Sequence, residues 1–196
     1  KNETDLYGYA LSSLDPRKGE KLYGIGANWP GNTGTNTGDV DYFFGMKLSA
    51  QFMQSENGLD AWGHDLVFEF SGDDDFWLYV DGMLVLDLGG VHSAIDGSVN
   101  FRTGKVYYYD DKGKLSETTL RELYKKAFLE NHPDLTGDEA SVQEFLDGYF
   151  KDGGTVFKDF SGHTMNMFYM ERGAAASNIH MRFNLTTYTE GEVLLE

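Results

Sequence analysis

The sequence predicts an all-β fold that is interrupted by one pair of helices. In residues 66–70, Leu66, Phe68 and Phe70 recur with a period of two and share one face, which is typical of a strand. Asp81-Gly82 separates two apolar runs and favours a tight hairpin, because both central residues of a type I′ turn need positive φ. Residues 116–150 change to a period of three to four, which is typical of amphipathic helices.

Strands are predicted wherever apolar and aromatic residues run between turn signals, at 40–52, 66–70, 76–80, 83–88, 155–160, 163–171 and 179–188. The stretch from Leu66 to Leu88 is expected to form a three-stranded meander. In the run Tyr107 to Tyr109, alternation must place one ring on the face opposite the other two.

The two predicted helices begin with capping boxes. Thr119 with Glu122 and Thr136 with Glu139 have the required spacing, and His132-Pro133 is expected to end the first helix. We expect a single domain over residues 1–196, with the helical insertion at 116–152.

Composition narrows the possible functions. The net charge of −16 disfavours nucleic acid and anionic membranes as partners, and it favours divalent cations. The absence of cysteine excludes disulfides and thiolate metal sites. The chain shows no signal peptide or membrane-spanning run, and it is expected to be a segment of a longer protein with flanking modules.

Three consecutive carboxylates, Asp73, Asp74 and Asp75, lie between two predicted strands. Like charges at this spacing repel one another, and hard oxygen ligands of this kind suit Ca²⁺. The sequence therefore predicts a calcium site here, with a solvated acidic turn as the alternative.

Three segments carry a resemblance to a known family. They are residues 41–46 (DYFFGM), 70–92 (FSGDDDFWLYVDGMLVLDLGGVH) and 168–178 (FYMERGAAASN). Together they resemble the fibro-slime domain, a branch of the PA14 superfamily. The resemblance implies a jelly-roll-like β-sandwich in a large bacterial surface protein, and hence an extracellular location at the bacterial cell surface.

The same resemblance implies a ligand set for calcium. In sugar-binding relatives of this family, an Asp-Asp pair joined by a cis peptide binds the ion, and the matching pair here is Asp73-Asp74. A second loop contributes an Asn side chain, for which Asn178 is the candidate, with Ser177 beside it as a ligand-contact candidate. Asp75 is a departure from those relatives, and it either completes the shell of the ion or bonds backbone.

Several other side chains are candidates for ligand contact. Trp29 lies in a Gly/Asn/Thr-rich loop, and Trp77 follows the aspartate run directly; stacking on a sugar ring and core packing are the two alternatives for Trp77. His92 is a candidate for lining the pocket or for a structural role. Asp87 is expected to cap the Gly-Gly turn that follows it, and Glu171 to pair with backbone or with an arginine such as Arg182.

The sequence contains none of the motifs expected for a catalytic site, and we predict that the protein is not an enzyme. The predicted function is calcium-dependent binding of a ligand, a glycan foremost, by an adhesion domain of a bacterial surface protein. The alternative is a structural or protein-binding adhesin module in which calcium only rigidifies the loops.

Overall fold

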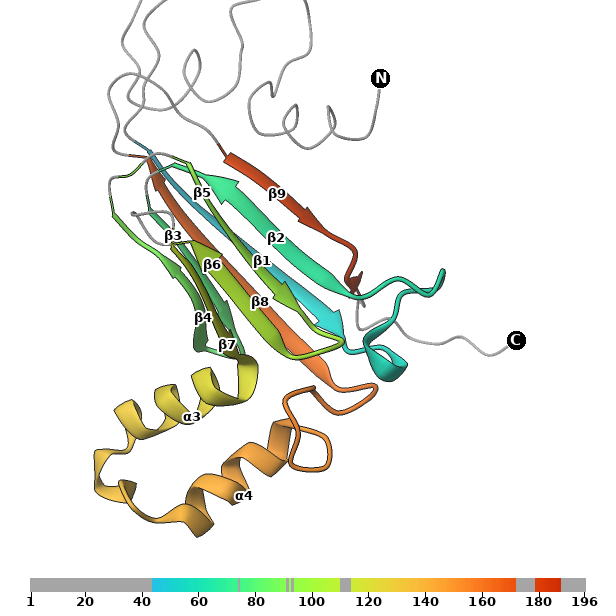
Figure 1. Ribbon diagram of the computed structural model, residues 1–196, viewed down its shortest axis with the longest axis vertical. Helices are drawn as coiled ribbons and strands as arrows, with labels where there is room; N and C mark the ends of the chain where they lie inside the picture. The colour runs from blue at the N-terminus through green and yellow to red at the C-terminus, as the bar shows by residue number, and fades with distance from the viewer. Residues whose placement is uncertain are drawn as a thin grey trace, which may run out of the picture.

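Two antiparallel β-sheets packed face to face form the body of the protein (Figure 1). The computed structural model describes residues 44–73, 75–90, 92, 94–109, 114–171 and 179–187. Within these ranges, sheet 1 has the strand order β10-β1-β8-β3-β4, and sheet 2 has the order β7-β6-β5-β2-β9. The predicted all-β sandwich with a helical insertion is confirmed.

The strands of sheet 1 are β1 Phe44–Met53, β3 Asp75–Val80, β4 Met83–Leu88, β8 Gly162–Glu171 and β10 Thr186–Thr187. The strands of sheet 2 are β2 Val67–Gly72, β5 Ile95–Asn100, β6 Lys105–Tyr109, β7 Leu115–Thr119 and β9 Ile179–Phe183.

Aromatic side chains from the two sheets meet in the core. Phe68 and Phe70 on β2 stack on Phe76 of β3, with ring centroids 6.0 and 3.8 Å apart. All three rings are buried, and each buried ring of this size contributes about 1.5–3 kcal/mol through removal of apolar surface from water.

The predicted meander from Leu66 to Leu88 is wrong. β2 pairs with β5 and β9 in sheet 2, whereas β3 pairs with β4 and β8 in sheet 1. The chain leaves sheet 2 after Gly72 and enters sheet 1 at Asp75, and the apolar faces of β2 and β3 then pack against each other through Phe70 and Phe76. The β3–β4 hairpin is confirmed, with φ of 51° at Asp81 and 80° at Gly82.

Other strand predictions differ in detail. Residues 155–160 form no strand and contribute only the isolated bridge between Phe150 and Phe157. β5 and β7 were not among the predicted strands, because short polar strands carry a weak alternation signal, and β6 was anticipated only through the alternation of Tyr107 to Tyr109. Tyr108 packs against the core while Tyr107 and Tyr109 line a groove on the outer face, as alternation predicted.

Helices α3 (Leu120–Asn131) and α4 (Glu139–Tyr149) lie together at one end of the sandwich (Figure 1). Short 3-10 turns η1 (Glu56–Gly58) and η2 (Pro133–Leu135) precede β2 and α4. Residues 116–119, placed within the insertion by the sequence, belong to β7 instead. Neither helix of the described chain has the length and apolar character needed to cross a membrane.

The first capping box is confirmed and the second is wrong. Thr119 accepts from the backbone N–H of Glu122, whose carboxylate accepts from the Thr119 backbone in return. At α4 the N-cap is Asp138, which accepts from Ser141 N at 3.2 Å. Asp138 is itself a strong cap, and it lies two residues after Thr136, so Glu139 occupies the first helical position and not the third that a capping box requires.

Candidate functional site

A groove of about 680 Å³ runs over the outer face of sheet 1. Strands β1, β8 and β3 form its floor. Side chains alternate between the two faces of a strand, so every second side chain of these strands faces the groove. On β3, Phe76, Leu78 and Val80 point into the core, which leaves Trp77 and Tyr79 half-buried on the groove side. The lining residues are Gly45, Met46, Lys47, Trp77, Tyr79, Gly82, Asn166, Phe168, Tyr169 and Met170.

Strand register brings the groove side chains together in two rows. Phe168 on β8 lies between Lys47 on β1 and Trp77 on β3. In the next row, Asn166 lies between Ser49 and Tyr79.

The groove side chains of the two rows make close aromatic and cationic contacts. The rings of Tyr79 and Phe168 meet edge to face, with centroids 5.7 Å apart and an interplanar angle of 87°. The ammonium of Lys47 lies 5.6 Å from the centroid of Phe168. The floor is therefore an aromatic surface with a cation at one margin.

Polar groups on the groove floor retain donors for a ligand. Ser49 donates its hydroxyl proton to Asn166 Oδ1 at 2.8 Å, which orients the amide. Within the described chain, no hydrogen bond occupies the amide nitrogen of Asn166 or the indole N–H of Trp77. These two donors and the Lys47 ammonium can reach acceptor oxygens in the groove.

Gly89 permits the position of the Trp77 indole. A Cβ atom at Gly89 would lie only 3.3 Å from both Cζ2 and Nε1 of Trp77. The adjacent Asp87 accepts from the backbone N–H of Gly89 at 3.2 Å, which confirms its expected role in the turn. The loop after β4 thus supports one edge of the aromatic floor.

Two of the three aspartates predicted to bind calcium, Asp73 and Asp75, lie at the same end of β3 as Trp77. Asp75 is buried, at 5% exposed, and its Oδ1 accepts from the backbone N–H of Gly90 at 2.6 Å, so one oxygen bonds backbone. Asp73 is half-buried. His92 Nε2 lies 3.1 Å from the carbonyl oxygen of Leu88, in the loop rather than in the groove of sheet 1.

The other predicted site residues, Trp29, Asp74, Ser177 and Asn178, lie outside the described residues, and so does the Asp73-Asp74 peptide bond. Among the residues that are described, no three acidic, histidine or cysteine side chains gather to hold a metal. Calcium binding by the aspartate run stays a prediction.

The suggested pairing of Glu171 with Arg182 is wrong. Arg182 lies on the other sheet, where its Nε donates to Glu69 at 2.6 Å. Glu171 is buried at the end of β8 and accepts from the hydroxyl of Tyr169 at 2.8 Å.

A partly buried Ser-His-Asp hydrogen-bond chain was missed by sequence reasoning. Ser161 Oγ lies 2.6 Å from His163 Nε2, and His163 Nδ1 lies 2.6 Å from Asp81 Oδ2. Ser161 Oγ also donates to the carbonyl of Lys158 at 2.6 Å. Because a carbonyl can only accept, the serine proton is directed away from the imidazole, the reverse of what nucleophile activation requires.

The surroundings of His163 also favour a structural role. His163 is 3% exposed and stacks on Phe157 with centroids 4.0 Å apart, so its ring faces side chains and not a cleft. The sequence signal for these three hydrogen-bonded residues was the Asp81-Gly82 turn alone, and Asp81 lies 82 positions from His163 in the sequence.

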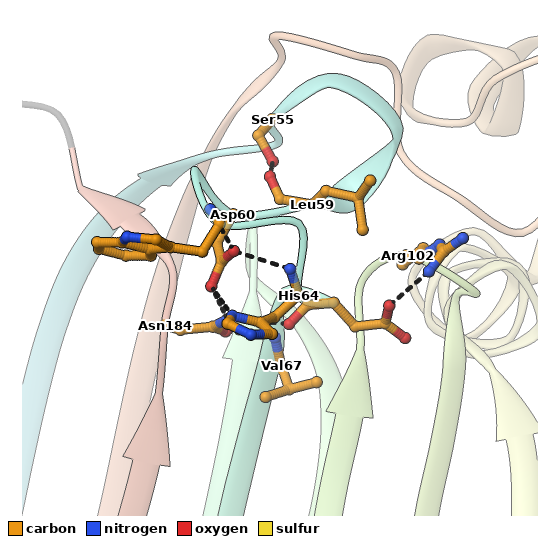
Figure 2. A network of polar contacts seen from close by, with 9 residues as sticks. Ser55, Leu59, Asp60, His64, Val67, Arg102 and Asn184 are labelled. Carbon is orange, nitrogen blue, oxygen red and sulfur yellow. Dashed lines mark hydrogen bonds and ion pairs between the residues drawn. The ribbon is translucent and has the colours of Figure 1, made fainter.

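A second polar network holds the loop between η1 and β2 (Figure 2). Asp60 accepts from the backbone N–H groups of Trp62 and His64, each at 2.9 Å, and from the side chain of Asn184 at 3.1 Å. Asn184 in turn accepts from Val67 N at 2.8 Å. The loop is thus tied to the start of β2 and the end of β9, and it holds Trp62 with 82% of its surface exposed.

This network predicts a pH dependence of stability. Desolvation acts to raise the pKa of Asp60, but hydrogen bonds from His64, Trp62 and Asn184 outweigh it and lower the pKa to about 2. A carboxyl group with a depressed pKa stabilises the fold fully above its unfolded pKa, near 3.9, and loses that contribution as the pH falls to about 2. We expect the thermal midpoint of Asp60→Asn to fall less between pH 4 and pH 2 than that of the wild type. Equal slopes for the two proteins would contradict this assignment.

Comparison with known proteins identifies relatives in the eukaryote Dictyostelium discoideum. Protein psiP is 34% identical over 138 residues, protein psiB 37% over 114 residues and protein psiC 32% over 104 residues. These matches cover 60%, 56% and 50% of this chain, and the chain spans 17% of the length of each relative. No family model matches the sequence, and no solved structure matches it.

These findings correct the family resemblance and the function that was based on it. The relatives are eukaryotic and no family model matches, so the assignment to a fibro-slime or PA14 domain of a bacterial adhesin is wrong. The predicted calcium-dependent bacterial adhesion function and its structural-adhesin alternative are withdrawn with it. What the comparisons establish is that this chain is similar, over 60% of its length, to a segment of the Dictyostelium discoideum protein psiP.

Proposed function

We propose that the groove of sheet 1 binds a saccharide through aromatic stacking and direct hydrogen bonds. The observation that carries this proposal is the half-buried indole of Trp77, which lies beside Tyr79 and Phe168 on an open sheet face. The C–H faces of a sugar ring are apolar and pack on aromatic faces, while its hydroxyls need polar partners at the margin.

The polar partners have the chemistry that a sugar requires. Lys47 and the Asn166 amide donate to hydroxyl oxygens, and the indole N–H of Trp77 is a third donor. Few polar groups on a mostly apolar surface are typical of ligand sites, where the apolar floor supplies affinity and the polar groups fix orientation.

The groove side chains contact the ligand themselves, so this mode of binding uses no metal. We therefore expect binding to persist in the presence of a chelator, in contrast to the withdrawn calcium-dependent mode. The extracellular location predicted from the sequence is compatible with a glycan ligand, and it too stays a prediction.

Replacement of Trp77 tests the proposal. We expect Trp77→Ala to weaken saccharide binding by about 2 kcal/mol, roughly 30-fold in Kd, because the stacking surface is removed. A glycan array identifies a saccharide that the wild type binds, and isothermal titration calorimetry then measures the Kd of that saccharide for each protein. Trp62→Ala is the matched control, because Trp62 is exposed on the loop of Asp60, away from the groove.

Two results would overturn the proposal. One is an array on which the wild type binds no glycan above the signal of Trp77→Ala. The other is equal loss of binding in Trp62→Ala and Trp77→Ala. Equal thermal midpoints of wild type and Trp77→Ala would show that a loss of binding comes from the groove and not from unfolding.

A further inference from the structure

A second, more polar groove of about 300 Å³ lies on the outer face of sheet 2. It is on the opposite side of the sandwich from the groove of sheet 1, because each groove uses the outer face of its own sheet. The side chains that carry its polar and aromatic character include Ser71, Asp96, Ser98, Tyr107, Tyr109 and His180.

Strand register orders these side chains. Ser71 on β2 lies between Asp96 on β5 and His180 on β9. Gly97, between Asp96 and Ser98 on β5, points into the sandwich, where a Cβ would lie 2.9 Å from Leu88. Asp96 and Ser98 therefore both face the groove.

The groove carries one carboxylate in excess of its cations. Glu69 is neutralised by Arg182, with 2.6 Å between Oε2 and Nε. On the neighbouring strands, Lys105 is neutralised by Glu117 at 2.7 Å. Asp96 is exposed, and no ion pair within the described chain involves it.

Two tyrosines form the aromatic wall. Tyr107 and Tyr109 alternate onto the same face of β6, and Tyr109 is 39% exposed. The ammonium of Lys105 lies 5.9 Å from the centroid of Tyr107, so this wall already attracts one cation. A second ammonium beside Tyr109 would also face the Asp96 carboxylate.

We infer that this groove binds one residue of a cationic amino sugar, with Asp96 as the counter-ion of its ammonium group. Tyr109 and Tyr107 pack against the ring and its cation, and Ser71, Ser98 and His180 accept or donate hydrogen bonds to hydroxyls. An ammonium has three N–H donors, fewer than the polar side chains that line the groove. That surplus favours a polyhydroxylated cation over the aliphatic stem and single ammonium of a lysine side chain.

The test is a titration of isotope-labelled protein followed by NMR chemical shifts, with four small probes. Glucosamine is the expected ligand, and glucose and N-acetylglucosamine are its neutral counterparts. Lysine amide acetylated on its α-nitrogen carries the side-chain ammonium without the sugar. We expect glucosamine to bind about tenfold more tightly than each other probe and to shift the amides of Ser71, Ser98 and Tyr107, a difference that weakens at high salt.

Matched carboxylate variants assign the effect. Asp96→Asn should bind glucosamine no more tightly than glucose, whereas Glu144→Gln, which alters an exposed carboxylate on α4 and not in the groove lining, should bind as the wild type does. Trp77→Ala should leave these shifts unchanged, which separates this groove from that of sheet 1. Equal affinities for glucosamine and glucose, for glucosamine and the lysine amide, or for Asp96→Asn and wild type would each overturn the inference.

Discussion

Replacing Asp81 by alanine is expected to lower the free energy of unfolding by about 3 kcal/mol, since it leaves the buried His163 and the backbone N–H of Thr164 without this acceptor. Asp81 accepts from Thr164 N at 2.8 Å, and its Oδ2 lies 2.6 Å from His163 Nδ1. The Tyr124 hydroxyl lies 3.1 Å from both Asp81 Oδ2 and the carbonyl oxygen of Val80, so the two acceptors share its proton. His163 is buried, at 3% exposed, so water reaches its ring poorly in place of the lost carboxylate.

The same carboxylate joins three parts of the fold. It links the β3–β4 hairpin to the start of β8 and, through Tyr124, to helix α3. Burial, together with the nearby charge of Asp81, raises the pKa of Tyr124 far above its ordinary value, so this hydroxyl stays a donor at any pH at which the protein is folded. Loss of Asp81 should therefore act mainly on the hairpin and the start of β8, because the Tyr124 hydroxyl of α3 keeps the Val80 carbonyl as its acceptor.

Thermal and denaturant unfolding measure this effect, with Asp152→Ala as the matched control. Asp152 also has positive φ, at 50° against 51° for Asp81, but it is exposed and makes no comparable network. The control therefore carries the backbone cost of alanine at positive φ without the loss of buried partners. If Asp81→Ala and Asp152→Ala lowered stability equally, the network would have no energetic role.

Gly104→Ala is expected to lower the free energy of unfolding by about 3–5 kcal/mol, from backbone strain together with overpacking. Gly104 has a φ of 69°, and an added Cβ would lie 2.0 Å from the carbonyl oxygen of Thr155. The clash is with backbone, so a change of side-chain rotamer cannot relieve it.

The position of Gly104 explains why the effect should be large. Gly104 accepts from Leu120 N at 2.8 Å where α3 begins, and Thr155 donates to the Thr103 carbonyl at 2.8 Å where the chain returns from α4. Both ends of the helical insertion therefore meet the turn between β5 and β6 at this glycine.

Gly137→Ala is the control for Gly104→Ala. Gly137 has a φ of 93°, but nothing lies within 4 Å of its added Cβ. It should lose only about 1–2 kcal/mol, the cost of a left-handed backbone for a non-glycine residue. Comparable losses for the two variants in denaturant unfolding would refute the close approach at Thr155.

Local features of the fold were predictable because they depend on neighbours in the chain. The Asp81-Gly82 hairpin needs two residues that tolerate positive φ, and Thr119 with Glu122 needs only a spacing of three. The Asp138 cap of α4 was missed because several polar residues before that helix compete for the same role.

The grooves were only partly predictable. Residues 76–80 are apolar or aromatic at every position, so alternation cannot say which face of β3 is buried. Trp77 was a candidate for ligand contact, but Tyr79, Asn166 and Phe168 were not. They join it only through the pairing of β3 with β8, whose residues lie about 90 positions away in the chain.

By itself, the sequence determined an all-β framework, the β3–β4 hairpin, the position of the two helices and the acidic character of the chain. The tertiary structure alone decided that β2 and β3 belong to different sheets, that Asp81 meets His163, and that each sheet carries a groove on its outer face. The reason is that turns and caps are selected by a few adjacent residues. Strand partners are selected instead by the total apolar surface that the whole chain can bury, and no local pattern encodes that sum.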